Sequence, residues 1–259
     1  KINFNKLDNK NINLIDVNFN FRNTFDKISD KSNLYIKDCF KLGLEILKNH
    51  NCRGLINGPI SKKNFLKQKF LGITEFLAKK VNKTNQVAML IYNKKLSVSP
   101  ITTHLPLKEV HKHITKRKII NHVKLIKEFY NKEFNKIPKI AITGLNPHCE
   151  SNYKSSEEDK VIKPAIKYLL KNGYKINGPF SADTIFMKEQ SKKYDVIIGM
   201  YHDQVLTPIK TLMGFDAINI TLGLPFTRIS PDHGPNSAML GKNLSNPYSL
   251  IQALRFLDK

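Results

Sequence analysis

Three histidines stand in the same kind of place, just past the end of a run rich in β-branched residues: His104, His148 and His202. In open α/β sheets, ligands bind in the crevice outside the carboxyl ends of the strands. Three imidazoles in such a crevice can hold a divalent metal ion and leave one coordination position for a substrate. Taken singly, each is equally a loop histidine with a local hydrogen bond. The shared placement is therefore what predicts a metal site.

A second group of residues could bind an anion. Lys210, Asn219 and Arg228 offer a point charge, a neutral amide and a forked guanidinium, which suit an acidic, phosphorylated substrate. Lys210 could equally be one more surface lysine. Arg228 is harder to assign to the surface, because only five of the 43 basic residues are arginine and this one ends the tight, mostly apolar segment 223–228.

The glycines do not form a nucleotide-binding motif. The twelve glycines of the chain include neither a Gly-x-Gly-x-x-Gly run nor a Walker A motif. A dinucleotide, if bound, is then not held by the usual Rossmann turn. P-loop nucleotide chemistry is not expected.

The net charge of +22 raises the question of nucleic-acid binding. The lysines are scattered, with no basic block and no interleaved aromatic residues, which favours a solvated lysine-rich surface over a nucleic-acid groove. Three cysteines without Cys-x-x-Cys spacing indicate neither a disulfide framework nor a thiolate zinc site, and fit a reducing cytoplasm. No apolar run approaches the ~18 residues of a membrane helix, and the start has no signal-peptide core.

These side chains need a sheet to bring them together. Strands are predicted at residues 54–57, 87–92, 96–102, 139–143, 195–200 and 217–222. The second and third strands are separated by three residues, a spacing that suits an antiparallel hairpin. Because helices alternate with these strands, the chain predicts a three-layer α/β sandwich.

Three helices are indicated between the strands. The first, at about 33–48, buries apolar residues on one face, and the second begins at the N-cap Thr115 and carries the stripe Ile119, Val123, Ile126 and Tyr130. The third opens with Ser155 and Glu158 at capping-box spacing and stops at Gly173, with a kink or break expected at Pro164. The histidines on polar helical turns are expected to be solvated: His111, His113 and His122.

Eight short segments, spread between about residues 53 and 241, occur in the order typical of one enzyme family. They are residues 57–62 (NGPISK), 72–76 (GITEF), 102–107 (TTHLPL), 144–148 (GLNPH), 178–184 (GPFSADT), 200–204 (MYHDQ), 219–226 (NITLGLPF) and 232–234 (DHG). On these segments the chain resembles the 4-hydroxythreonine-4-phosphate dehydrogenases of vitamin B6 biosynthesis.

The resemblance implies a fold and an assembly. Similar enzymes have the isocitrate and isopropylmalate dehydrogenase fold, here two intertwined α/β subdomains over residues 1–259 with a cleft between them, one subdomain including about 90–220. They are homodimers whose sites are shared, with metal ligands drawn from both subunits. By position, the metal falls on His104, His148 and His202, and substrate contacts fall on Thr74, Lys210, Asn219 and Arg228.

The resemblance also implies a reaction. Similar enzymes use NAD or NADP to oxidise the secondary hydroxyl of 4-phosphohydroxy-L-threonine, and the resulting β-keto acid loses carbon dioxide to give 3-amino-2-oxopropyl phosphate. A divalent metal such as zinc, magnesium or cobalt can lower the pKa of the hydroxyl and polarise the ketone. Asp183 and Asp203 are candidates to orient ligands or relay a proton, and either could instead cap a helix or turn.

Several positions depart from the family pattern. Ile73 stands where a histidine is usual, residues 149–153 replace a glycine-rich stretch, and Pro235, Asn236 and Ala238 replace the residues that usually follow the DHG segment. The family's opening strand and its glycine-rich loop have no counterpart before Asn57, which suggests a missing or divergent N-terminal segment.

Two alternatives stay open from the sequence. A related dehydrogenase could act on a phosphorylated sugar acid of the phosphothreonate type, or a basic binding protein could keep the fold without the catalysis. The six dispersed polar residues of the metal and anion groups favour an enzyme, since a protein released from catalysis need not keep them.

Overall fold

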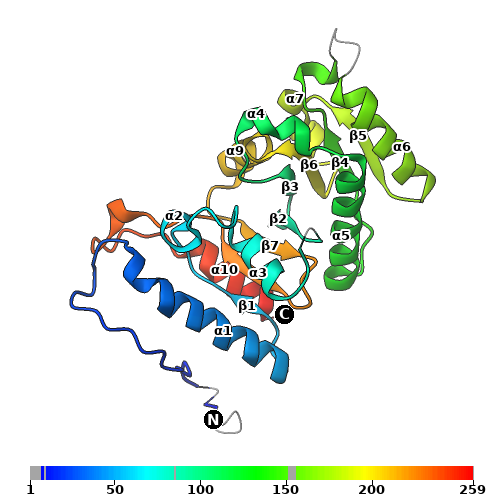
Figure 1. Ribbon diagram of the computed structural model, residues 1–259. Coiled ribbons are helices and arrows are strands. Elements are labelled where there is room, and N and C mark those ends of the chain that lie inside the picture. Colours follow the sequence, from blue (N-terminus) through cyan, green and yellow to red (C-terminus); the bar gives the residue numbers. More distant parts are fainter. Residues whose placement is uncertain (1–6, 9, 85, 151–155, 259) are drawn as a thin grey trace.

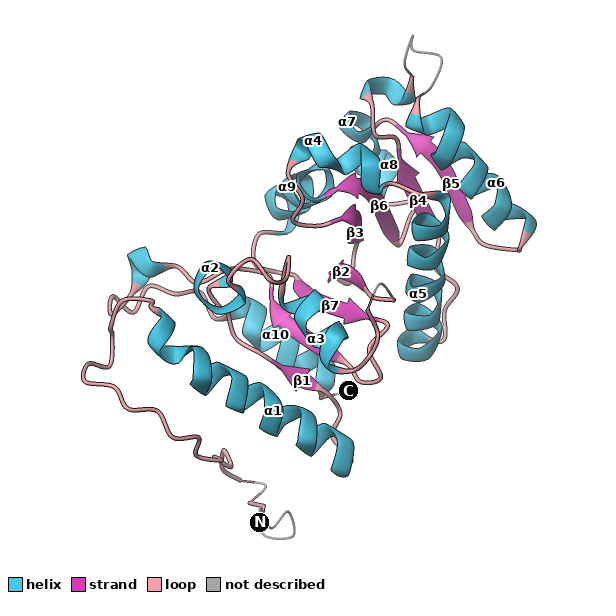
Figure 2. Ribbon diagram, in the orientation of Figure 1, coloured by secondary structure: helices cyan, strands magenta, loops and turns pink. Residues whose placement is uncertain are grey.

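The computed structural model describes residues 7–8, 10–84, 86–150 and 156–258. Within them a mixed eight-stranded sheet has the order β1-β8-β7-β2-β3-β6-β4-β5, with helices on both faces (Figure 1, Figure 2). The strands are β1 (Leu55–Ile56), β2 (Ala88–Tyr92), β3 (Ser97–Thr102), β4 (Ile140–Thr143), β5 (Ile176–Phe180), β6 (Val196–Tyr201), β7 (Ile218–Leu222) and β8 (Arg228–Pro231). The predicted three-layer α/β fold is confirmed.

The pairing of the strands confirms the predicted hairpin. β2 and β3 are antiparallel, with Ile91 opposite Val98, and β2 also pairs antiparallel with β7. β3, β6, β4 and β5 run parallel to one another. Two strands were not predicted, because β5 contains Gly178 and Pro179 and β8 runs only from Arg228 to Pro231. Such residues are more typical of turns than of strands.

The helices lie between these strands in the chain. They are α1 (Asn33–Asn49), α2 (Lys62–Leu66), α3 (Ile73–Lys80), α4 (Leu107–Val110), α5 (Lys116–Phe134), α6 (Lys163–Lys171), α7 (Ala182–Ile185), α8 (Lys188–Ser191), α9 (His202–Met213) and α10 (Tyr248–Leu257). The N-cap at Thr115 is confirmed, because its side chain accepts a hydrogen bond of 3.2 Å from the backbone N–H of Lys118.

Strand alternation divides the apolar residues between the two faces of the sheet. Leu90 and Ile220 face one side, where α5, α6 and α10 pack, and Met89 and Ile91 face the other side, against α7 and α9. A third cluster joins α1, α2 and α3 through the aromatic rings of Phe40, Phe65 and Phe76. The sheet is therefore covered on both faces.

The start of the third predicted helix differs from the expectation. Ser155 lies outside the described residues, and the carboxylate of Glu158 is fully buried against the loop before His148. A π-helical turn, Glu158–Ile162, leads into α6, and Pro164 lies in the first turn of α6. The helix continues through Pro164 without a break, and the π-helical turn directly before it is the irregularity that the structure shows at this point.

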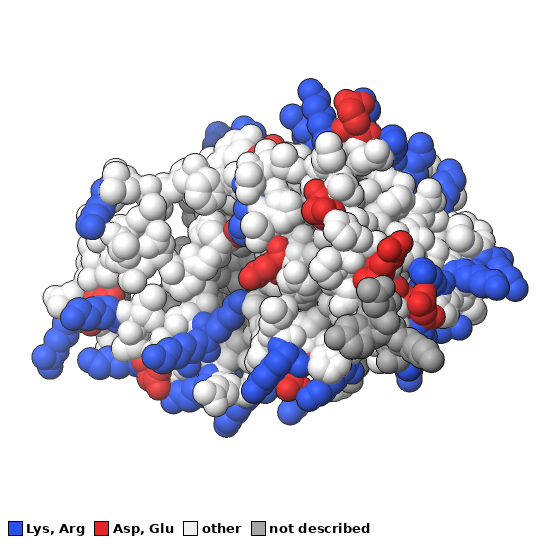
Figure 3. Space-filling view, turned by 90° about the horizontal axis from the view of Figure 1, so that it is seen from above, with Lys and Arg blue, Asp and Glu red and all other residues white. Residues whose placement is uncertain are grey.

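The surface carries the excess of lysine. Figure 3 shows Lys and Arg side chains spread over one face of the molecule rather than gathered in a single block. In the N-terminal segment before α1, large apolar side chains are exposed, Ile12 by 96% and Leu14 by 86%. Among the described residues, no helix combines the length and the apolar character needed to cross a membrane.

Candidate active site

A hydrogen-bond network around one buried arginine lies at the β7–β8 pair. We call it the arginine network, and its members are Arg228, Asn57, Thr221 and Thr74. Arg228 is 3% exposed, and its Nε donates to Asn57 Oδ1 at 2.8 Å while Nη1 donates to Thr221 Oγ1 at 3.0 Å. Thr74, at the start of α3, shares a hydrogen bond of 3.3 Å with the same threonine hydroxyl. Burial lowers the pKa of Arg228 to about 10, so the guanidinium keeps its charge at neutral pH. The structure thus brings Thr74 and Arg228 together, as the sequence predicted.

The other two predicted anion-binding residues are placed differently. Asn219 lies two residues before Thr221 on β7, opposite Ser230, and its Oδ1 is buried without a hydrogen-bond partner among the described residues. Lys210, near the end of α9, donates to the carboxylate and to the carbonyl oxygen of Asp232 at 2.8 and 2.6 Å. The ammonium group of Lys210 is therefore already paired with the carboxylate of Asp232.

His104 and His202 lie together beyond the ends of β3 and β6, with ring centroids 5.5 Å apart. Nε2 of His104 is 2.6 Å from Lys62 Nζ, and its Nδ1 is buried without a partner in the described chain. Burial, followed by the charges of Lys62 and His202, lowers the pKa of His104 to about 4. The ring is therefore neutral at pH 7, which is the form that binds a metal.

Backbone geometry and a carboxylate fix these two rings. A Cβ atom at Gly72 would lie 3.3 Å from the ring of His104, so the glycine allows the close approach of α3. His202 Nδ1 is 2.6 Å from Asp203 Oδ1, which orients the first residue of α9. This places Asp203 beside a predicted metal ligand.

His148 lies apart from this pair. It is exposed, at a backbone φ of 57° in the turn Pro147–Cys149, and this loop is held by Glu158, whose Oε1 accepts from the N–H groups of Leu145 and Asn146 at 2.7 and 2.8 Å. The predicted catalytic Asp183 accepts from Ser181 Oγ at 2.6 Å. That hydrogen bond, together with the nearby His148, lowers the pKa of Asp183. Across the described part of the chain, no three His, Cys, Asp or Glu side chains gather closely enough to hold a metal ion.

A cavity of about 750 Å³ lies between α3, α5 and the edges of β2 and β3. Its lining includes Thr74, Glu75 and Thr103, so it adjoins the arginine network and the loop of His104. His122 also lines it and is 5% exposed, so the expectation that this histidine is solvated is wrong. The reason is that His122 follows Ile119 by three residues and precedes Ile126 by four, which puts it on the buried face of α5.

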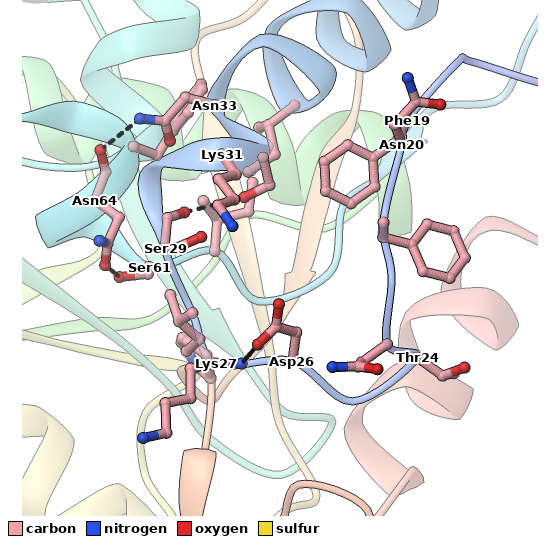
Figure 4. Close-up of a pocket in the computed structure, with 18 of the residues that line it drawn as sticks. Phe19, Asn20, Thr24, Asp26, Lys27, Ser29, Lys31, Asn33, Ser61 and Asn64 are labelled. Carbon is pink, nitrogen blue, oxygen red and sulfur yellow. Dashed lines mark hydrogen bonds between the residues drawn. The ribbon is translucent and has the colours of Figure 1, made fainter.

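A larger cavity, of about 870 Å³, lies between the N-terminal segment and α2 (Figure 4). Asn64 accepts from Asn33 Nδ2 at 3.0 Å and from Ser61 Oγ at 2.7 Å on its wall. None of the predicted site residues lines this cavity. It is therefore separate from the candidate site.

Sequence reasoning did not assign roles to four residues that the structure places here: Asn57, Lys62, Glu75 and His122. The first three lie inside segments 57–62 and 72–76, so the family segments already contained the signal. For His122, the spacing from Ile119 and Ile126 in the apolar stripe of α5 could have indicated that the side chain is buried.

Comparison with known proteins identifies the family of the chain. Residues 1–257 match the family model described as pyridoxal phosphate biosynthetic protein PdxA. Over 247 residues the chain is 42% identical to a 4-hydroxythreonine-4-phosphate dehydrogenase of Sulfurihydrogenibium sp., covering 94% of this chain and 74% of that protein. A relative of the same name from Bradyrhizobium diazoefficiens is 38% identical over 212 residues, which cover 79% of this chain and 61% of its own length.

Solved structures give the same result. A 4-hydroxythreonine-4-phosphate dehydrogenase from Klebsiella pneumoniae superposes with a TM-score of 0.76 at 28% identity, covering 90% of this chain and 72% of that one. Isocitrate dehydrogenase from Methylococcus capsulatus shares the fold, with a TM-score of 0.53 at 12% identity over 86% of this chain and 73% of that one. The resemblance seen in the eight segments is confirmed, and the chain belongs to the PdxA family.

Proposed function

We propose that this chain catalyses the metal-dependent, NAD(P)-linked oxidation and decarboxylation of 4-phosphohydroxy-L-threonine to 3-amino-2-oxopropyl phosphate. The observation that carries the proposal is the buried, doubly hydrogen-bonded guanidinium of Arg228 beside Thr74, in a chain whose relatives are named for this substrate. The hydroxyl carbon gives up a hydride to the nicotinamide and the hydroxyl oxygen gives up its proton. The resulting β-keto acid then releases carbon dioxide and takes up a proton.

In this proposal the arginine network binds the phosphate end of the substrate. Asn57 and Thr221 hold the guanidinium in one orientation, so little side-chain freedom is lost when an anion binds. Asn219 contributes a side chain whose carbonyl oxygen has no hydrogen-bond partner in the part of the chain that the structure describes. Lys210 either releases Asp232 to reach the anion or keeps that carboxylate neutralised.

His104 and His202 are the residues that would hold the metal. Their donor type fits, since both are imidazoles and His104 is neutral, with one ring nitrogen that carries a lone pair. That nitrogen, Nε2, accepts from Lys62 in this structure, so Lys62 would move aside when a metal binds. A bound divalent metal would supply charge stabilisation at the hydroxyl oxygen and later at the ketone oxygen. His148, in the turn Pro147–Cys149, lies near Asp183 at the start of α7, and in the proposed homodimer with shared sites the partner subunit completes the ligand set. Asp203 orients His202 in this scheme.

The test is reduction of NAD or NADP, followed spectrophotometrically, with 4-phosphohydroxy-L-threonine, with and without added Zn²⁺, Mg²⁺ or Co²⁺. We expect turnover that requires both the phosphate group and a metal. Turnover of a phosphorylated sugar acid alone, or none with any metal, would overturn the assignment. Light scattering tests the homodimer, and cell fractionation tests the cytoplasmic location.

A further inference from the structure

The side-chain amide of Gln204 joins the ends of two neighbouring strands, β4 and β6. Its Oε1 accepts from the backbone N–H of Met200 in β6, at 2.7 Å, and from Oγ1 of Thr143 in β4, at 2.9 Å. Its Nε2 donates to the carbonyl oxygen of Gly144, directly after β4, at 2.9 Å. The amide therefore connects the end of β6 to the loop that follows β4.

This connection lies beyond the backbone pairing of the two strands. Among the described residues, the last backbone pair between β4 and β6 is Ile142 with Ile198. A Cβ atom at Gly199, the next residue of β6, would lie 3.0 Å from Oε1 of Gln204, so the glycine leaves the room that the amide occupies. The side chain of Gln204 thus extends the connection between the strands past their last backbone pair.

The two connected segments lead to predicted metal ligands. Met200 lies two residues before His202, and Gly144 lies four residues before His148. Histidine nitrogens bind zinc at about 2.0 to 2.1 Å, so small displacements of a ligand-bearing loop are enough to weaken a site. The relative position of these two segments is therefore a requirement of the metal site, in whichever subunit each histidine meets the ion.

Other hydrogen bonds hold the neighbouring segments. Thr102, two residues before His104, donates to the carbonyl oxygen of Met200 at 2.7 Å, which joins the end of β3 to β6. Within the loop that leads to His148, the carboxylate of Glu158 accepts from two backbone N–H groups. The amide of Gln204 links these two arrangements to each other.

We propose that Gln204 is a positioning residue, which fixes the loop of His148 relative to the start of α9 at His202, an inference that rests on the proposed function. Gln204 itself touches neither metal nor substrate. An amide suits this role because it accepts on one atom and donates on the other. A carboxylate of the same length only accepts, so it would lose the bond to the carbonyl oxygen of Gly144 and keep the bonds made by Oε1.

The experiment measures Co²⁺ binding to the purified chain by visible absorption, without substrate or cofactor. In Gln204→Glu we expect the affinity for Co²⁺ to fall by about tenfold or more, with a shift of the absorption bands as the coordination geometry changes. Gln204→Met removes the amide without adding a charge and should show the same loss. Thr143→Val is the matched control, because it removes a buried hydroxyl from the same cluster but keeps the bond to Gly144, and it should bind Co²⁺ like the parent chain.

Urea unfolding of the same variants separates positioning from stability alone. A merely structural role predicts that the affinity for Co²⁺ falls in proportion to the loss of unfolding free energy in all three variants, Thr143→Val included, and this result would overturn the inference. Because the two substitutions of Gln204 differ in charge, either one that folds is sufficient for the test.

The outcomes also separate this inference from the proposed function. Co²⁺ affinity and spectra in both Gln204 variants equal to those of Thr143→Val would overturn the inference and leave the proposed function standing. If the Gln204 variants lost affinity as expected but the parent chain did not reduce NAD or NADP, the proposed function would fail alone. A parent chain that bound no Co²⁺ would overturn both.

Discussion

The arginine network and the cavity next to it differ in their hydrogen bonds. In the network, Asn57 and Thr221 accept from two of the N–H groups of Arg228, so the guanidinium is oriented before the substrate phosphate binds. Among the described residues of the cavity and of the adjoining histidine pair, Glu75, His122 and His104 each keep one buried polar atom without a hydrogen-bond partner. An oriented guanidinium holds a charge in place, whereas an unpaired buried polar atom marks where a partner has yet to bind.

The largest effect is expected from a substitution of His104, in the histidine pair. His104→Ala removes an imidazole that we assign to the metal, so metal content should fall and turnover should drop by about 100-fold or more. Metal content by atomic emission and turnover are the measurements, with the exposed His111→Ala as control. An unchanged metal content would show that His104 is not a ligand.

Arg228→Lys tests the arginine network. Lysine cannot donate to Asn57 and Thr221 in the same fork, so the affinity for 4-phosphohydroxy-L-threonine should fall by tens of times, equivalent to ~1.5 to 3 kcal/mol. Calorimetry with the phosphorylated and dephosphorylated amino acid is the measurement. Equal losses on both ligands would assign Arg228 to packing alone.

Ile73→His tests whether position 73, next to Thr74 in α3, contacts the ligand or packs inside the protein. Ile73 precedes Thr74 but is 8% exposed and packs with Phe40, Phe65 and Phe76. An imidazole in that apolar cluster would lose its water, so the free energy of unfolding should fall by ~1 to 3 kcal/mol. Urea unfolding is the measurement, with Ile73→Leu as the control. A variant of parental stability that binds substrate more tightly would show that position 73 faces the ligand.

A further prediction concerns acid stability. Burial, with a smaller contribution from Lys118, lowers the pKa of His122 to about 3. Because the unfolded state takes up a proton near pH 6.5 and the folded state does not, the stabilising contribution is present above about pH 6.5 and is lost as the pH falls toward 3. His122→Gln should flatten the fall of the unfolding free energy in this window by up to ~1.4 kcal/mol per pH unit. Urea titrations of His122→Gln and of the exposed His111→Gln that gave the same slope would contradict the assignment.

Much of the fold was predictable from alternation and helical spacing, since β2, β3 and the α5 stripe are regular. β5 and β8 were not, because Gly178, Pro179 and Pro231 break the usual strand pattern. The meeting of Thr74 with Arg228 was found only through the family segments, since no local pattern joins residues 154 positions apart. The hydrogen bonds that remain open at Glu75 and His122 depend on three-dimensional packing between two helices, which spacing along one helix does not report.

The scattered lysines of Figure 3 affect how often reactants reach the site. The substrate and the dinucleotide of the proposed reaction are both anions, and a net charge of +22 attracts them over distances beyond direct contact. At ~0.15 M ionic strength this attraction extends about 8 Å, and added salt shortens it. Encounter would therefore slow as salt is raised, while the rate of the saturated enzyme, set by chemistry inside the fold, would change far less.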